Sequence, residues 1–275
     1  GGGSACIGRR GYPFVGTQFV QFAQATMRQR VLPYREIPDI LAAMTMAVSD
    51  AANGIGGVLE KMAEIQAVLP SQDGVAWFNR LYAKTTEAIA QAIADGRFEA
   101  PELLEELDVV FAQLYFAAYD GDRAGDEIPK AWSPLFEVRS SQAIAPIQFA
   151  LAGMNAHINR DLPFAVATVA ERHCFEPRED SAFYRDFLVV NEILKETEAK
   201  VKVWFAEGFV GEVDRAFGDV DDRIALWSIV HARTTAWENA ELLWGLRTLP
   251  ALREPFGSAL DRLVGMAGRA LLVAP

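Results

Sequence analysis

The sequence predicts an all-α fold, and three observations support this prediction. Apolar residues recur at helical spacing along most of the 275 residues, alanine and leucine are abundant, and the alternating pattern typical of β-strands is scarce. Hydrophobic residues make up 51% of the chain, which is enough for a sizeable core. We therefore expect a single bundle-like domain of about eight to ten helices, preceded by an N-terminal helical extension.

Two segments with helical periodicity occupy the N-terminal part of the chain. The first covers residues 17–32 and ends before Pro33, and the second covers residues 40–69, where three closely spaced glycines predict a kink or a break. The predicted organisation, in chain order, is residues 1–4 as a segment that resembles a cloning linker, 5–55 as a partly helical N-terminal extension, and 56–275 as the helical core domain.

The next two predicted helices carry clear signals at their ends. The segment 73–96 begins with Asp73, a good N-cap residue, and ends at Gly96, which favours the left-handed conformation found after helices. The segment 101–122 starts with Pro101 and acidic residues, which suit the first turn of a helix and its dipole.

Beyond these helices, residues 121–142 form the longest predicted loop. Periodic apolar residues then return, and Pro163 divides one long apolar stretch into two expected helices, because proline lacks the N–H that a helix interior needs. The remaining predicted helices cover about residues 143–160, 163–173, 181–207, 220–247 and 250–272.

Charge and composition exclude several classes of partner. The formal net charge is -11 and the isoelectric point about 4.9, so the surface repels phosphate backbones and we expect no nucleic-acid partner. No apolar run reaches the length of a membrane span. Two cysteines without a paired spacing fit a reducing compartment, so we predict a cytoplasmic protein. The N-terminal helices are apolar enough to form a homo-oligomer.

The most unusual segment is residues 151–165, "LAGMNAHINRDLPFA", where polar residues interrupt an apolar run. On a helix His157 and Asp161 are neighbours one turn apart, and Asn155 and Asn159 form a second such pair. An oriented His–Asp pair is typical of a general base, and the same two side chains could supply half of a divalent metal site. The alternative is architectural: Asp161 caps the following helix, His157 donates to it, and the asparagines satisfy backbone groups.

A second unusual segment, residues 221–247, combines a buried cation with aromatic residues. Arg233 shares a stripe with Trp237, Glu241 and Trp244. A buried arginine requires a carboxylate or an aromatic face, so Glu241 and Trp237 are its expected partners. The group is either a structural ion-pair network or a pocket in which Arg233 holds an anionic or carbonyl oxygen.

Two further residues are candidates for the wall of such a pocket. Tyr82 lies in the inner stripe of the helix predicted over 73–96, and Asn191 lies among apolar residues of the helix predicted over 181–207. A buried amide must find hydrogen-bond partners, so Asn191 either ties helices together or faces a pocket. Tyr82 is either an ordinary core residue or a substrate contact.

Several long segments of the chain resemble one helical family of mainly bacterial proteins that is known only as a domain of unknown function. The resemblance runs from about Val58 to Val273, and its most recognisable motif is "GMNAHINRDLP". A second motif, "AWENAELLWGLR", includes Asn239 beside Glu241, which makes Asn239 a further candidate for substrate binding. The resemblance implies a helical, cytoplasmic protein and supplies no activity.

Three hypotheses about function follow from these residues. The first is an enzyme, a hydrolase or a lyase or cyclase, that acts on a small hydrophobic molecule in an aromatic-lined pocket. Its catalytic candidates are His157, Asp161, Arg233 and Glu241, and its substrate-binding candidates are Tyr82, Asn155, Asn159, Asn191, Trp237, Asn239 and Trp244. The sequence requires no cofactor, and a divalent metal at His157 and Asp161 stays open. The second hypothesis is a non-catalytic protein that binds a hydrophobic ligand, and the third is a structural or oligomerising helical protein.

Overall fold

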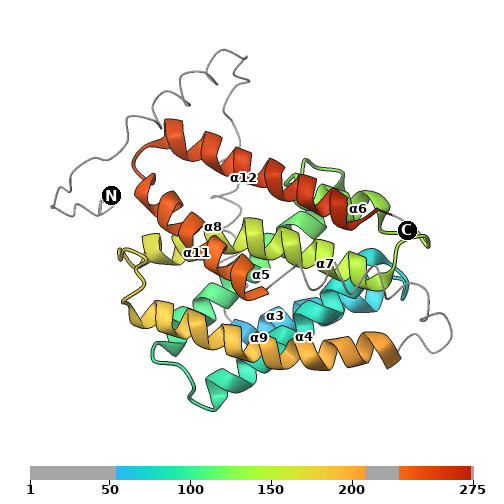
Figure 1. Cartoon of the computed structure of the whole chain (residues 1–275), viewed down its shortest axis with the longest axis horizontal. Coiled ribbons are helices and arrows are strands. Elements are labelled where there is room, and N and C mark those ends of the chain that lie inside the picture. The colour runs from blue at the N-terminus through green and yellow to red at the C-terminus, as the bar shows by residue number, and fades with distance from the viewer. Residues whose placement is uncertain (1–53, 208–228, 274–275) are drawn as a thin grey trace. The chain divides into compact units, whose positions relative to one another are not determined.

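The secondary structure of the described residues is entirely helical. The computed structural model describes residues 54–207 and 229–273, and no strand occurs within these ranges (Figure 1). This confirms the predicted all-α fold class. The described residues all belong to one compact unit, which lies within Ser49–Pro275. The predicted linker, the helix at 17–32 and the N-terminal oligomer contacts lie outside them and stay predictions.

The first three described helices begin where local signals predict. Helix α3 (Gly54–Val68) starts at the first of the clustered glycines, and Gly54 has a positive φ of 52°. Helix α4 (Gly74–Ala94) is capped by the Asp73 carboxylate, which accepts a hydrogen bond of 2.8 Å from the Val75 N–H. Helix α5 (Pro101–Ala124) has Pro101 in its first turn and ends at Gly125, which adopts the left-handed conformation. The predicted helix ends at 73 and 101 are thus confirmed.

The prediction of a continuous loop over residues 121–142 is wrong. Helix α5 extends to Ala124, and a short helix, α6 (Ser133–Val138), lies within the predicted loop. Trp132 at its N-terminus is fully buried, as is Leu135 within it. Burial of these large apolar side chains offsets the entropy cost of ordering the segment, which local turn residues alone do not reveal.

Pro163 does not divide the central helix, contrary to the prediction. Helix α7 (Pro146–Ala156) continues through a π-helical turn, η2 (His157–Asp161), into α8 (Leu162–Arg172). The Leu162 N–H donates to the His157 carbonyl, five residues earlier, so the turn contains one more residue than an α-helical turn. Because this widening alters the backbone bonds beside Pro163, the chain accommodates the proline without a break.

The π-turn lies at the centre of the described part of the domain. Helices α4 and α12 (Pro250–Leu271) pack on α7, whereas α5 and α11 (Ile229–Gly245) pack on α8 and on the π-turn itself. Helix α9 (Ala182–Glu207) packs against α4, α5 and α11. Figure 1 shows α7 and α8 running across the middle of the view. The fold therefore buries the polar segment instead of displaying it.

The sequence predicts that the chain has no membrane span and that it resides in a reducing compartment, and these two predictions have different outcomes. Within the described residues, no helix combines the length and apolarity required to cross a membrane. Cys174, which follows α8, is not a free thiol. The cysteine argument for a reducing compartment therefore loses its support, and a cytoplasmic location stays a prediction.

Candidate active site

Asp161 is the hub of a buried hydrogen-bond network. Its side chain is fully buried, and its Oδ2 lies 3.1 Å from His157 Nδ1 and accepts a 3.0 Å hydrogen bond from Trp132 Nε1. Arg160 donates to the other oxygen, Oδ1, at 2.7 Å. Asp161 makes no side-chain bond to the N-terminus of α8, so the interpretation of this residue as a helix cap is wrong. The i,i+4 pairing of His157 with Asp161 is confirmed.

The imidazole of His157 is held rigidly and keeps one nitrogen without a partner. The Phe111 ring stacks on it with a centroid separation of 3.5 Å and an interplanar angle of 6°, and Tyr82 packs edge-on at 4.4 Å. The Asp161 carboxylate can only accept a hydrogen bond from His157 Nδ1. We therefore assign the proton of the imidazole to Nδ1, which leaves a lone pair on Nε2. Nε2 is buried and has no hydrogen-bond partner. Burial lowers the pKa of His157 and Asp161 only partly opposes this, so the neutral form is favoured.

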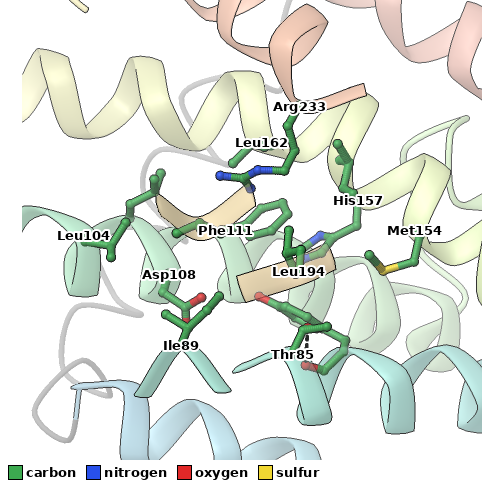
Figure 2. A pocket seen from close by; sticks show the side chains of 14 residues that line it. Thr85, Ile89, Leu104, Asp108, Phe111, Met154, His157, Leu162, Leu194 and Arg233 are labelled. Atoms are coloured by element: carbon green, nitrogen blue, oxygen red, sulfur yellow. Dashed lines mark hydrogen bonds between the residues drawn. The ribbon is translucent and has the colours of Figure 1, made fainter. Parts of the chain in front are cut away.

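His157 lines a cavity of about 40 Å³ between helices α4, α5, α7, α8, α9 and α11 and the π-turn. Figure 2 shows Arg233 reaching in from the top of the view and Asp108 lying lower in it. The ionisable side chains of the wall are Tyr82, Asp108, His157 and Arg233, and the others are Thr85, Ile89, Leu104, Leu107, Phe111, Met154, Ile158, Leu162, Val190 and Leu194. The wall is therefore mainly apolar, with a few polar groups that converge.

Arg233 is a buried cation with no carboxylate in contact. Its Nε donates to Asn191 Oδ1 at 2.6 Å, its Nη2 donates to the Phe187 carbonyl at 3.1 Å, and its Cζ lies 4.0 Å from the centre of the Phe187 ring. Among the described residues it has no ion pair, and Nη1 has no hydrogen-bond partner. Burial lowers the pKa of Arg233 to about 9, against the attraction of the more distant Asp108. The guanidinium is thus charged at neutral pH and offers one free donor group to the cavity.

Sequence reasoning missed Asp108, the carboxyl group in this cavity. Asp108 is 6% exposed, and its Oδ2 has no hydrogen-bond partner. Burial raises the pKa of Asp108 to about 7, although Arg233 opposes the shift. The signal that could have identified it is its place in the stripe Leu104, Asp108, Phe111 and Tyr115 of α5, where it is the single charge among buried apolar and aromatic side chains.

The two asparagines of the polar segment have an architectural role. The Asn155 amide donates to the Val264 carbonyl of α12 at 3.0 Å, and Asn159 donates to Asn155 Oδ1 at 3.1 Å. Asn191 positions Arg233 through the bond described above and does not itself line the cavity. Of the predicted substrate contacts, the cavity wall includes Tyr82 alone.

The expected partnership of Arg233 with Glu241 is wrong. Glu241 instead accepts a 2.9 Å hydrogen bond from Trp237 Nε1, and Trp237 packs on aromatic residues of α9. Glu241 and Trp244 line a separate surface hollow together with residues 176–180. Asn239 is half-buried on α11 and does not line the cavity. Helix α11 thus directs Arg233 into the cavity and the other candidates elsewhere, because residues on one helix stripe diverge in space when the helix crosses its neighbours.

The described residues do not fit a divalent metal. Within residues 54–207 and 229–273, no three His, Cys, Asp or Glu side chains lie close enough to share an ion. Both oxygens of Asp161 already accept hydrogen bonds from protein donors. His157 and Asp161 therefore lack the further ligands that a metal site needs, and no chemical step is derived through a metal.

Comparison with known proteins gives a family but no activity. The model of one protein family, the family of unknown function DUF5995, matches residues 55–274. The chain belongs to this family. No curated protein and no solved structure matches the chain significantly. The DUF5995 match contains every residue of the cavity, so the cavity lies in the part of the chain that defines its membership.

Proposed function

We propose that the protein is an enzyme that acts on a small hydrophobic molecule by general acid–base chemistry, with His157 as the base. The observation that supports this most directly is His157 Nε2, a buried nitrogen with a lone pair and no partner, on the wall of a cavity that also holds a cation. A buried polar atom without a partner destabilises the fold, so its presence favours a functional requirement.

In this proposal each group has a role that suits its position. Asp161 fixes the orientation and tautomer of His157, as a positioning residue, and His157 removes a proton from the substrate or from a water molecule. The free Nη1 of Arg233 donates to the oxygen on which negative charge develops. Such an arrangement suits hydrolysis, elimination or cyclisation. The cavity of about 40 Å³ has room for roughly three water molecules, so it accommodates the reacting end of a substrate or a very small substrate.

The test is a substrate panel assayed with matched histidine variants. Small esters, lactones, epoxides and 3-hydroxy acids cover hydrolysis and elimination, and product formation is followed by mass spectrometry. We expect His157→Gln to lower the rate by roughly 10²–10⁴-fold, the usual contribution of a general base. His173→Gln is the control, because His173 is half-exposed and pairs with Glu106 away from the cavity. Equal rates for wild type and His157→Gln would refute the assignment.

The alternative is a non-catalytic protein that binds a hydrophobic ligand, and the mainly apolar wall of the cavity favours it. The two functions differ in one readout. A binding protein retains ligand affinity in His157→Gln and turns over no compound in the panel. A purely structural protein would show neither binding nor turnover. The cytoplasmic location and an oligomer formed through the N-terminal residues stay predictions.

A further inference from the structure

We propose that the cavity binds a small monocarboxylate, whose carboxylate group accepts hydrogen bonds from Arg233 Nη1 and from the carboxyl group of a protonated Asp108. This inference rests on the proposed function in that it concerns the same cavity. It adds the class of ligand and a second residue, Asp108, that binds this ligand together with Arg233. It does not require turnover.

The first argument is the unbalanced charge of Arg233. Arg233 is 4% exposed as a residue, and its Nε and Nη2 donate to neutral oxygens of Asn191 and Phe187. No described carboxylate lies within ion-pair distance of it. A buried cation without a counter-ion is costly, and a carboxylate is the group that matches the planar donors of arginine. Nη1 is the donor that remains for such a ligand.

The second argument is the carboxyl group on the opposite wall. Oδ2 of Asp108 is buried and has no partner, so the group lies in the cavity wall with unused hydrogen-bonding capacity. The charged or titratable groups that influence it are Arg233 from α11, Glu105 from its own helix and Tyr82 from α4, and His157 lines the same cavity. Burial and Glu105 raise the pKa of Asp108 to about 7, so near neutrality its protonated form is available as a donor. An anion bound beside it favours that form further.

The third argument is charge and size. With Asp108 protonated and His157 neutral, the cavity carries the single positive charge of Arg233, which one monoanion balances. A cavity of about 40 Å³ holds roughly three water molecules, which matches formate or acetate or the carboxylate end of a longer chain. The apolar wall suits the short hydrocarbon part of such an acid.

Proton linkage gives the proposal a specific signature. Because the ligand binds the form with a protonated Asp108, the affinity falls as the pH rises above the pKa of about 7. The expected slope is a loss of about tenfold in affinity per pH unit above 7. The ligand itself does not cause this dependence, since small carboxylic acids are already ionised there.

The experiment is titration calorimetry of the full chain with sodium acetate and sodium formate at pH 6, 7, 8 and 8.5, with sodium chloride as the comparison anion. We expect saturable binding at millimolar or lower concentration, with proton uptake above pH 7 visible as a heat that depends on the buffer. Asp108→Asn keeps a donor at the same place, so it should bind acetate with little pH dependence. Arg233→Gln should weaken binding by at least about tenfold, and Arg262→Gln, an exposed residue of α12, is the control for the lost charge.

Three results would overturn the proposal: no saturable binding of either acid, chloride binding as tightly as acetate, or an unchanged pH dependence in Asp108→Asn. Circular dichroism and Arg233→Lys, which keeps the charge and should keep part of the affinity, separate loss of the site from loss of the fold. Binding without turnover in the substrate panel would refute the proposed enzyme and leave the ligand assignment standing. Turnover of uncharged substrates without acetate binding would do the reverse.

Discussion

Replacement of Asp161 provides the strongest test of the buried network. In Asp161→Ala, three donors lose their acceptor: His157 Nδ1, Trp132 Nε1 and Arg160 Nη1. Two of these side chains are essentially fully buried, and each unsatisfied buried donor costs about 1–3 kcal/mol. Arg160 is partly exposed and keeps Asp261 nearby at 3.7 Å, so its loss is smaller. The expected decrease in the free energy of unfolding is about 3–5 kcal/mol.

Asp161→Asn should cost less, because its remaining oxygen can still accept from both Trp132 and His157 while its amide faces Arg160. We expect a decrease of about 1–2 kcal/mol. Urea unfolding followed by tryptophan fluorescence measures both values. Asp180→Ala is the control, since its pair with Arg178 is exposed to solvent and should contribute little to stability. A decrease for Asp161→Ala no larger than that of Asp180→Ala would refute the reasoning.

Three further predictions concern protonation and packing. His157 should show the Nδ1–H tautomer by ¹⁵N NMR and stay neutral at pH 7. Since its folded-state pKa lies below the unfolded value of about 6.5, wild-type stability should fall below that pH, and this loss should be absent in His157→Gln. Asp108→Asn should be more stable than wild type at pH 8 by on the order of 4 kcal/mol, because the raised pKa of Asp108 makes its ionisation costly in the folded state. The difference in stability should shrink toward pH 4, where the carboxyl group is protonated in the folded state. Equal stability of the two proteins at pH 8 would contradict the raised pKa. On α12, Gly265→Ala should lower stability by about 1–3 kcal/mol in thermal unfolding, because the added Cβ meets the Lys130 backbone carbonyl. Gly268→Ala is the control, since a Cβ there would lie 3.5 Å from the nearest atoms. It should be neutral or stabilise the protein by up to about 1 kcal/mol.

The parts of the fold that could be predicted are those decided within a few residues of the chain. The Asp73 cap and the proline at the start of α5 act through local hydrogen bonds and fixed dihedrals, so the sequence pattern was sufficient. The short helix α6 and the passage of the central helix through Pro163 could not be predicted. Both depend on what surrounds them: the first on burial of Trp132 and its neighbours, and the second on a π-turn packed between α5, α11 and α12.

The candidate site likewise has features that the sequence predicts and features that depend on tertiary packing. The sequence alone determined that His157 and Asp161 are neighbours, because one turn of helix fixes that relation, and it identified Arg233 as a buried cation that needs a partner. Only the tertiary structure decided that Phe111 of α5 stacks on His157, that Asp108 lines the same cavity, and that Glu241 lines a separate surface hollow. Spacing along a helix specifies which residues share a face, whereas the packing of helices distant in the sequence decides which faces meet around a cavity.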